Sequence, residues 1–251
     1  MSSPTLKTLE LLQRLVESQG KHNLEAVAAQ MQIPLATAYR YVATLQKAGM
    51  VTRGRPGVFV PSFPFLSLVN DPGRASTRAI IAEPTLRRLA NKFSVIVQMA
   101  ILRDNMVQYI LKIGINEETL FTVVGTELEA YCSGLGKILL AHLSNDAIDN
   151  YLKEGPFVPL TENTITNPEN LRRELQRARD SGFAEDRGEI EPDLFCMAAP
   201  ITDPDGVVRS AISISQRVGT PYSLSDKQQA LLKPSLFAAA NEIEKNFGRA
   251  N

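Results

Sequence analysis

The chain has 251 residues, of which 44% are hydrophobic and 22% charged, values that exclude wholesale disorder and allow one large domain or two modest ones. Its formal net charge is zero, but residues 1–66 carry a net charge of +4 and the remainder −4. This asymmetry predicts that only the first part of the chain meets a polyanion.

The opening residues, "MSSPTLKTLELL", lack the basic-then-apolar layout of a signal peptide, and no apolar stretch approaches the length of a membrane span. The two cysteines, Cys132 and Cys196, have no spacing that indicates a disulfide framework or a zinc knuckle. We therefore expect a soluble cytoplasmic protein with no membrane partner.

Three short helices are predicted within the first 50 residues. Leucines recur at helical spacing through residues 5–19, and Asn23 can cap a second helix. Pro34 suits the first turn of a third helix, which Gly49 stops. Three helices with a tight turn between the second and the third predict a helix-turn-helix.

The exposed face of the predicted third helix carries small, hydroxyl and basic side chains, which suit close approach to a DNA groove. The segment "MVTRGRPGVFVPSF" that follows is a predicted β-hairpin with a basic tip, suited to a phosphate backbone or a minor groove. A winged helix-turn-helix is favoured over a three-helix protein-interaction module with an incidental basic loop. The expected DNA contacts are Ala36, Thr37, Tyr39, Arg40, Thr44, Lys47, Arg53 and Arg55.

A helical pattern, "RASTRAIIAEPTLRRLANKF", comes next and is interrupted by Pro84. Because proline ends or kinks a helix, we expect one helix to end at Glu83 and another to start at Pro84. Such a linker helix would be a natural dimerisation element. The alternative is that it is simply the first helix of the large domain.

The rest of the chain alternates hairpins with helices, which predicts an antiparallel sheet flanked by helices and hence an α+β fold. Two strands are expected around residues 104–105, a third at 120–124, and two more around 205–206. A terminal helical pattern spans residues 224–247, with a break at Pro234. Further helices are predicted in "GLGKILLAHL", "DAIDNYL" and "NPENLRRELQRARDSG".

Five carboxylates gather near a thiol in "GFAEDRGEIEPDLFCMAAP". A thiol enzyme would need an adjacent base, and His142 is the one histidine outside the first domain. A glycosidase would use paired carboxylates, but the chain has no tryptophan and few aromatics for a sugar platform. No metal-ligand spacing is diagnostic, so a small-molecule pocket is the favoured interpretation.

Such a pocket would draw on separate segments. Asp186 is expected in a turn and Cys196 at the start of an apolar strand, while Ser213 and Ser215 share one face of the next strand. The glycine-rich "YCSGLGK" leads into a helix whose free N–H groups and positive end favour an anion such as a carboxylate. Alternatively, the serines face solvent and the glycines merely form a turn.

Three stretches, "IPLATAYRYVATLQKAGMV", "CSGLGKILLAHL" and "SGFAEDRGEIEPDLFCMAAPITDPDGVVRSAISIS", occur in an order that resembles the IclR family of bacterial transcription regulators along nearly the whole chain. The resemblance implies a GAF-like effector domain, a dimer or dimer of dimers, and a small organic acid or aromatic effector. Glu189 and Glu191 are then expected to be structural partners or solvated charges. The implied effector-binding residues are Ser133, Gly134, Leu135, Asp186, Cys196, Ser213 and Ser215.

These observations predict a ligand-responsive transcription factor that binds operator DNA, without a cofactor or a metal. The expected domains are a winged helix-turn-helix over residues 1–68, a linker helix region over 69–92 and an effector-binding domain over 93–251. The rival class is an enzyme with an accessory DNA-binding domain that uses Cys196 or the carboxylates. A third possibility, a structural nucleoid protein, would have no ligand pocket.

Overall fold

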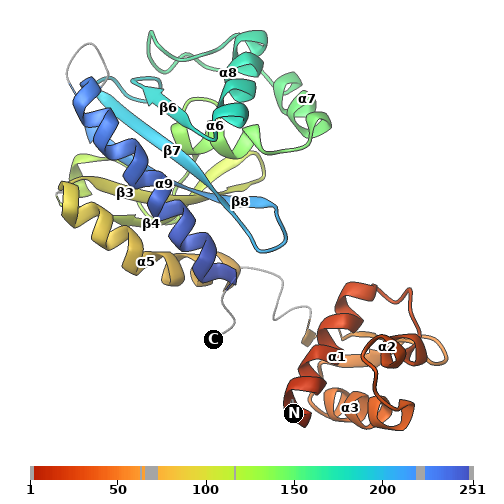
Figure 1. Ribbon diagram of the computed structural model, residues 1–251. Helices are drawn as coiled ribbons and strands as arrows, with labels where there is room; N and C mark the ends of the chain where they lie inside the picture. Colours follow the sequence, from red (N-terminus) through yellow and green to blue (C-terminus); the bar gives the residue numbers. More distant parts are fainter. Residues whose placement is uncertain (1–2, 63, 66–72, 116, 219–223, 249–251) are drawn as a thin grey trace. The chain divides into compact units, whose positions relative to one another are not determined.

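The computed structural model describes residues 3–62, 64–65, 73–115, 117–218 and 224–248, and the chain forms two compact units, Met1–Arg74 and Ala75–Asn251 (Figure 1). Part of the predicted linker region, residues 69–72, lies outside the described residues. The rest of that region, residues 73–92, lies within the helix Gly73–Phe93, and the second unit includes this helix from Ala75 onward.

Within the described residues up to position 62, the first unit has the three predicted helices and a two-stranded antiparallel sheet. Asn23 caps the second helix by accepting a hydrogen bond from the N–H of Ala26 at 2.9 Å, and Pro34 lies just before the third helix as its N-cap. One buried face of each helix, including Leu11, Val27 and Val42, forms a common apolar core. The elements are α1 Pro4–Ser18, α2 Leu24–Gln30, α3 Leu35–Lys47, β1 Val51–Arg53 and β2 Phe59–Pro61.

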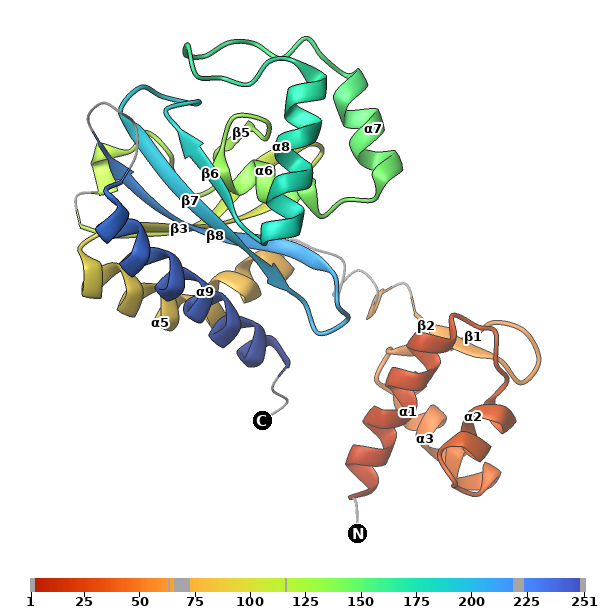
Figure 2. The same ribbon diagram turned by 45° about the horizontal axis from the view of Figure 1, so that its top comes forward.

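The second unit is built on a six-stranded antiparallel sheet with the strand order β5-β4-β3-β8-β7-β6 (Figure 2). Both predicted hairpins are confirmed, and Asp104 and Asn105 adopt the positive φ angles that a tight two-residue turn requires. The strands are β3 Ile96–Arg103, β4 Met106–Ile113, β5 Glu127–Glu129, β6 Ala184–Arg187, β7 Leu194–Thr202 and β8 Val208–Arg217.

Helices cover both faces of this sheet (Figure 2). The long helices α5 (Gly73–Phe93) and α9 (Asp226–Gly248) pack on one face against large apolar side chains such as Met197 and Ile212. On the other face, α6 (Gly134–Ala141) lies against alanines of the strands, with α7 (Asn145–Lys153) and α8 (Pro168–Ser181) beyond it. Within the described residues, no helix is long and apolar enough to cross a membrane.

The predicted helix breaks at Pro84 and Pro234 are wrong, because α5 and α9 run through both prolines. A proline removes one N–H and crowds the carbonyl of the residue four positions earlier. Here those residues, Ile80 and Ala230, are exposed, so water can satisfy the freed carbonyls. Buried residues on either side of each proline keep both helix segments on the sheet.

Two local predictions in the second unit also differ from the structure. Residues 120–124 do not form a strand, because the Nζ of Lys112 donates to the carbonyls of Leu120 and Thr122, and pairing with β4 begins only at Gly125. They follow a short 3₁₀ helix, η1 (Glu117–Thr119). Asp186, expected in a turn, lies in β6, the edge strand that pairs with β7.

We predict that Gly136→Ala destabilises the second unit by about 1–3 kcal/mol or more, since overpacking against backbone cannot relax easily. A Cβ at position 136 would lie 2.1 Å from the carbonyl oxygen of Ala130 and 2.5 Å from its Cα. Urea unfolding measures the change. Gly248→Ala is the control, because its Cβ would meet nothing within 4 Å. Equal effects of the two substitutions would contradict this close approach.

Candidate functional site

A small cavity lies on the α6 face of the sheet. Its volume is about 10 Å³, which is room for about one water molecule. A larger molecule can therefore enter only if a wall moves. The lining residues are Gln98, Tyr109, Leu120, Phe121, Thr122, Ser133, Gly134, Leu135, Asp186, Ile190, Leu194, Cys196 and Ser213.

The strand register brings the polar lining together. Asp186 pairs with Cys196 across β6 and β7, and Ser213 pairs with Gln98 across β8 and β3. Directly opposed residues of paired strands face the same side of the sheet, so these side chains all point towards α6. Six of the seven predicted effector residues line the cavity. The seventh, Ser215, lies beside it and donates a hydrogen bond to the Oε1 of Gln98 at 3.1 Å.

Gln98, Tyr109 and Thr122 are lining residues that the sequence analysis missed. Gln98 is almost completely buried and donates to the hydroxyl of Thr122 through its Nε2. A lone amide inside the apolar run "VIVQMAIL" is a signal that could have revealed it. Tyr109 and Thr122 join the cavity through the packing of β4 and of residues 120–122, which no local pattern encodes.

The N-terminus of α6 forms one wall. Ser133 caps the helix by accepting a hydrogen bond from the N–H of Gly136 at 3.0 Å, and Gly134 and Leu135 of the first turn line the cavity. First-turn N–H groups have no partner within a helix, and the helix dipole makes this end positive. A Cβ on Gly134 would lie 3.5 Å from the Cβ of Ala198, so the helix end packs directly on β7. This wall favours an anion.

Asp186 carries the carboxyl group of the opposite wall and is completely buried. Its Oδ1 accepts a hydrogen bond from the N–H of Glu189 at 2.7 Å, while its Oδ2 has no partner within the described structure. Burial raises the pKa of Asp186 to about 7. The Oγ of Ser213 is also buried without a partner. Since buried polar groups are nearly always hydrogen-bonded, these two indicate a place for a ligand or a water.

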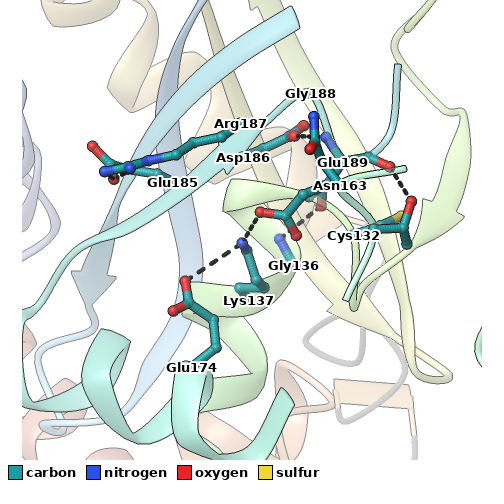
Figure 3. Close-up of polar contacts among 12 residues, drawn as sticks. Cys132, Gly136, Lys137, Asn163, Glu174, Glu185, Asp186, Arg187, Gly188 and Glu189 are labelled. Carbon is teal, nitrogen blue, oxygen red and sulfur yellow. Dashed lines mark hydrogen bonds and ion pairs between the residues drawn. The ribbon is translucent and has the colours of Figure 1, made fainter. Parts of the chain in front are cut away.

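A buried lysine supports the turn that holds Asp186 (Figure 3). The Nζ of Lys137 contacts the carboxylate of Glu189 and lies 3.5 Å from that of Glu174. Glu189 therefore fixes the turn through its side chain and donates to Asp186 through its backbone. Glu191 pairs with Arg217 at 2.6 Å. Both glutamates have the structural-partner role expected from the sequence.

The arrangement gives no support to thiol or metal chemistry. Burial raises the pKa of the Cys196 thiol well above its ordinary value, whereas a nucleophile needs a thiolate. His142 bonds the carbonyl of Ile138 in its own helix through Nδ1, at 2.8 Å. In the part of the chain that the structure describes, no group of three or more histidine, cysteine, aspartate or glutamate residues could hold a metal ion.

The first unit presents the predicted DNA-reading side chains on α3 and its wing. All are exposed except Thr37, which is half-buried. The ring of Tyr39 meets that of Phe59 edge to face at 6.3 Å, joining α3 to β2. Arg55 donates to the carbonyl of Gly20 at 3.1 Å, and the hydroxyl of Thr44 donates to the carbonyl of Arg40. Arg40, Lys47 and Arg53 leave their charges at the surface.

Each of the two units matches the model of a known protein family. The model described as "IclR helix-turn-helix domain" matches residues 5–55, and "Bacterial transcriptional regulator IclR C-terminal" matches residues 77–245. The Pca regulon regulatory protein of Pseudomonas putida is 30% identical over 239 residues, covering 94% of this chain and 80% of the relative. The transcriptional repressor IclR of Escherichia coli K12 is 27% identical, covering 96% and 88% respectively.

The fold is also similar to solved structures of transcriptional regulators. A putative transcriptional regulator from Rhodococcus sp. RHA1 is 27% identical, with a TM-score of 0.66 and complete coverage of both chains. The Thermotoga maritima IclR is 26% identical, with a TM-score of 0.64 and 98% coverage of each chain. The curated relatives named above are regulators of transcription, as their names state.

We predict that Asp186 makes the second unit less stable as the pH rises from about 4 to about 7. The folded state keeps a proton there, whereas the unfolded chain releases it near 3.8, so stability is lost as the pH approaches the folded pKa. The loss is at most about 1.4 kcal/mol per pH unit. In Asp186→Asn the amide oxygen can still accept the hydrogen bond from Glu189, but the side chain no longer titrates. This substitution should therefore abolish the part of the pH dependence of stability that Asp186 causes.

Urea unfolding of the wild type and of Asp186→Asn at several pH values tests this prediction. Asp180→Asn on the exposed surface of α8 is the matched control and should keep the wild-type pH dependence. Identical pH profiles for the wild type and Asp186→Asn would contradict the raised pKa.

Proposed function

The chain belongs to the IclR family of bacterial transcriptional regulators, and we propose that it binds a pseudo-palindromic operator as a homodimer or dimer of dimers under the control of a small organic acid or aromatic effector. The observation that carries the effector proposal is the pair of buried oxygens without a hydrogen-bond partner, the Oδ2 of Asp186 and the Oγ of Ser213, beside the N-terminus of α6. As a DNA-binding regulator it would act in the cytoplasm.

On the DNA side, α3 would enter a major groove, with the two recognition helices of a dimer roughly one helical turn apart. Small exposed residues such as Ala36 permit close approach, and Arg40 and Thr37 would read base edges. Lys47, Arg53 and Arg55 would contact phosphates and set the register without reading sequence. The hydrogen bond from Arg55 to Gly20 supports a fixed wing position.

On the effector side, the two polar walls suit complementary parts of one molecule. The positive end of α6 would receive a carboxylate. With a pKa of about 7, Asp186 is partly neutral near physiological pH, so it would tolerate a nearby anion and could donate or accept a hydrogen bond. Leu120, Phe121 and Leu194 supply apolar contact area. An acid with an apolar or aromatic body, especially one with a hydroxyl group, fits these walls.

Entry of such a molecule would require a wall to move, and we infer that this wall is formed by residues 120–122, which line the cavity. This segment is held by the hydrogen bonds from Lys112 and by the bond between Gln98 and Thr122. The effector would favour the arrangement in which these residues have moved. Its influence on DNA binding can be no larger than its differential affinity for the two states.

We predict that Arg40→Ala weakens binding to specific DNA by about tenfold or more, because a good base contact contributes about 1–3 kcal/mol of discrimination. Specific DNA is first selected by the protein from a random pool, and affinities are then measured on this DNA and on random DNA. Arg55→Ala and Lys47→Ala should weaken both about equally. Equal loss on both DNAs for Arg40→Ala would overturn its base-reading role.

A panel of small carboxylic acids and phenols should include compounds that raise the thermal stability of the protein. A ligand at about 100 times its dissociation constant adds roughly 2.7 kcal/mol to the native state. Asp186→Ala and Ser213→Ala should weaken or abolish the shift and leave DNA affinity largely intact. If both variants respond normally, the pocket lies elsewhere. Recovery of the compound unchanged supports a sensor, whereas its consumption would support the rival enzyme.

A further inference from the structure

A mostly buried ion pair joins the beginning of α5 to the turn between β7 and β8. Arg78 of α5 binds the Oδ2 of Asp203, the residue that directly follows β7, and Arg209 of β8 donates to the same oxygen at 3.0 Å. The side chains of Arg78 and Asp203 are 13% and 11% exposed, so salt and water screen their attraction only weakly. None of the three residues lines the cavity.

The pairing of Arg78 with Asp203 is incomplete. The Nε of Arg78 and the Oδ1 of Asp203 are both buried without a hydrogen-bond partner among the described residues. An arginine that binds a carboxylate with two parallel hydrogen bonds can use its Nε together with the neighbouring Nη2, one for each oxygen. Here only the Nη2 bond is made, and each unpaired buried atom costs free energy. A small shift of α5 against the turn would allow the second bond to form.

The ion pair lies where the two functional parts of the chain meet along the sequence. β7 carries Cys196 of the cavity near its start and leads into Asp203, while β8 carries Arg209 near its start and Ser213 of the cavity further on. Paired strands are stiff, so a shift of the cavity wall is carried to their common turn. On the other side of the pair, α5 continues directly from the first unit, which ends at Arg74.

Arg78 also lies in the more weakly anchored part of α5. Further along the helix, Leu86 and Leu89 are buried in the core that covers the sheet. Around Arg78, by contrast, Ser76, Thr77 and Ile80 are exposed. A helix that is fixed along its later turns can adjust at its beginning, which is where the incomplete pair holds it.

We propose that Arg78 and Asp203 form a two-position switch that couples the cavity to the DNA-binding unit. The one-bond pair belongs to one regulatory state and the two-bond pair to the other. This switch rests on the proposed regulatory function and names the element that the effector and the DNA both bias. Arg78 is a positioning residue that acts through α5. Because coupling between two binding sites is reciprocal, DNA alone should alter the cavity wall.

The test measures hydrogen exchange in the full-length protein, with and without saturating DNA that the protein has selected from a random pool. In the wild type, DNA should change exchange in the cavity segments 117–126 and 184–198 by about fivefold or more. Arg78→Lys should lose this response, because lysine keeps the charge but cannot form the two-bond pair. Arg88→Gln is the matched control, since it removes an exposed ion pair of α5 with Glu242, and it should respond like the wild type.

Asp203→Asn is a second variant that keeps an acceptor oxygen but removes the charge, and it should also lose the response. A wild-type response in both variants, or no response in the wild type, would overturn the switch. Urea unfolding of the same samples shows whether the fold persists, and loss of the response only together with loss of the fold would also overturn it. Failure to select any DNA would instead refute the regulatory function on which the switch rests, before any exchange is measured.

Discussion

The close contact of α6 with the sheet is the constraint on which the second unit depends. All eight residues of this helix are buried, and a Cβ on Gly134 would lie 3.5 Å from the Cβ of Ala198 in β7. At Gly136 even a methyl group would collide with the backbone of Ala130, which directly follows β5. The strands meet the helix with alanines, including Ala198 and Ala211, rather than with the larger side chains of the opposite face. This short distance sets the positive end of α6 directly against the polar row of β6, β7 and β8.

A helix buried this deeply has no exposed face for a charged side chain, so Lys137 needs partners inside the protein. Glu189 and Glu174 supply them from a turn and from a second helix. Burying an ion pair contributes little net stability, but removing one partner is costly, so such a pair fixes geometry more than it adds stability. Here the fixed geometry is that of the turn whose backbone N–H binds Asp186. Because Asp186 lines the cavity, this buried ion pair supports one wall of the cavity without touching it.

Much of the fold follows from local patterns, because helix periodicity, caps and two-residue turns act over only a few residues. The predictions at Pro84 and Pro234 failed because packing of long apolar faces outweighed the local cost of proline. The strand predicted at 120–124 does not form, because Lys112 donates hydrogen bonds to the carbonyls of Leu120 and Thr122 that a neighbouring strand would otherwise bind. Strand alternation predicted that Ser213 and Ser215 share one face of their strand. Only the register of the sheet shows that Gln98 lies opposite Ser213 and forms hydrogen bonds with both Ser215 and Thr122.

The small volume of the cavity explains why regulation through this site would need two states. In the observed state, Asp186 and Ser213 keep polar atoms without partners, and this costs free energy that a bound molecule could recover. Opposing this, movement of residues 120–122 would break the hydrogen bonds from Lys112 and Gln98 and would expose the buried side chain of Leu120 to water. An unsatisfied buried polar group costs about 1–3 kcal/mol, while a lost hydrogen bond costs about 0.5–1.5 kcal/mol and an exposed leucine about 1.5–3 kcal/mol, so the two sides oppose each other with contributions of the same order. Where such opposing contributions nearly cancel, a ligand of modest differential affinity can shift the population between the two states.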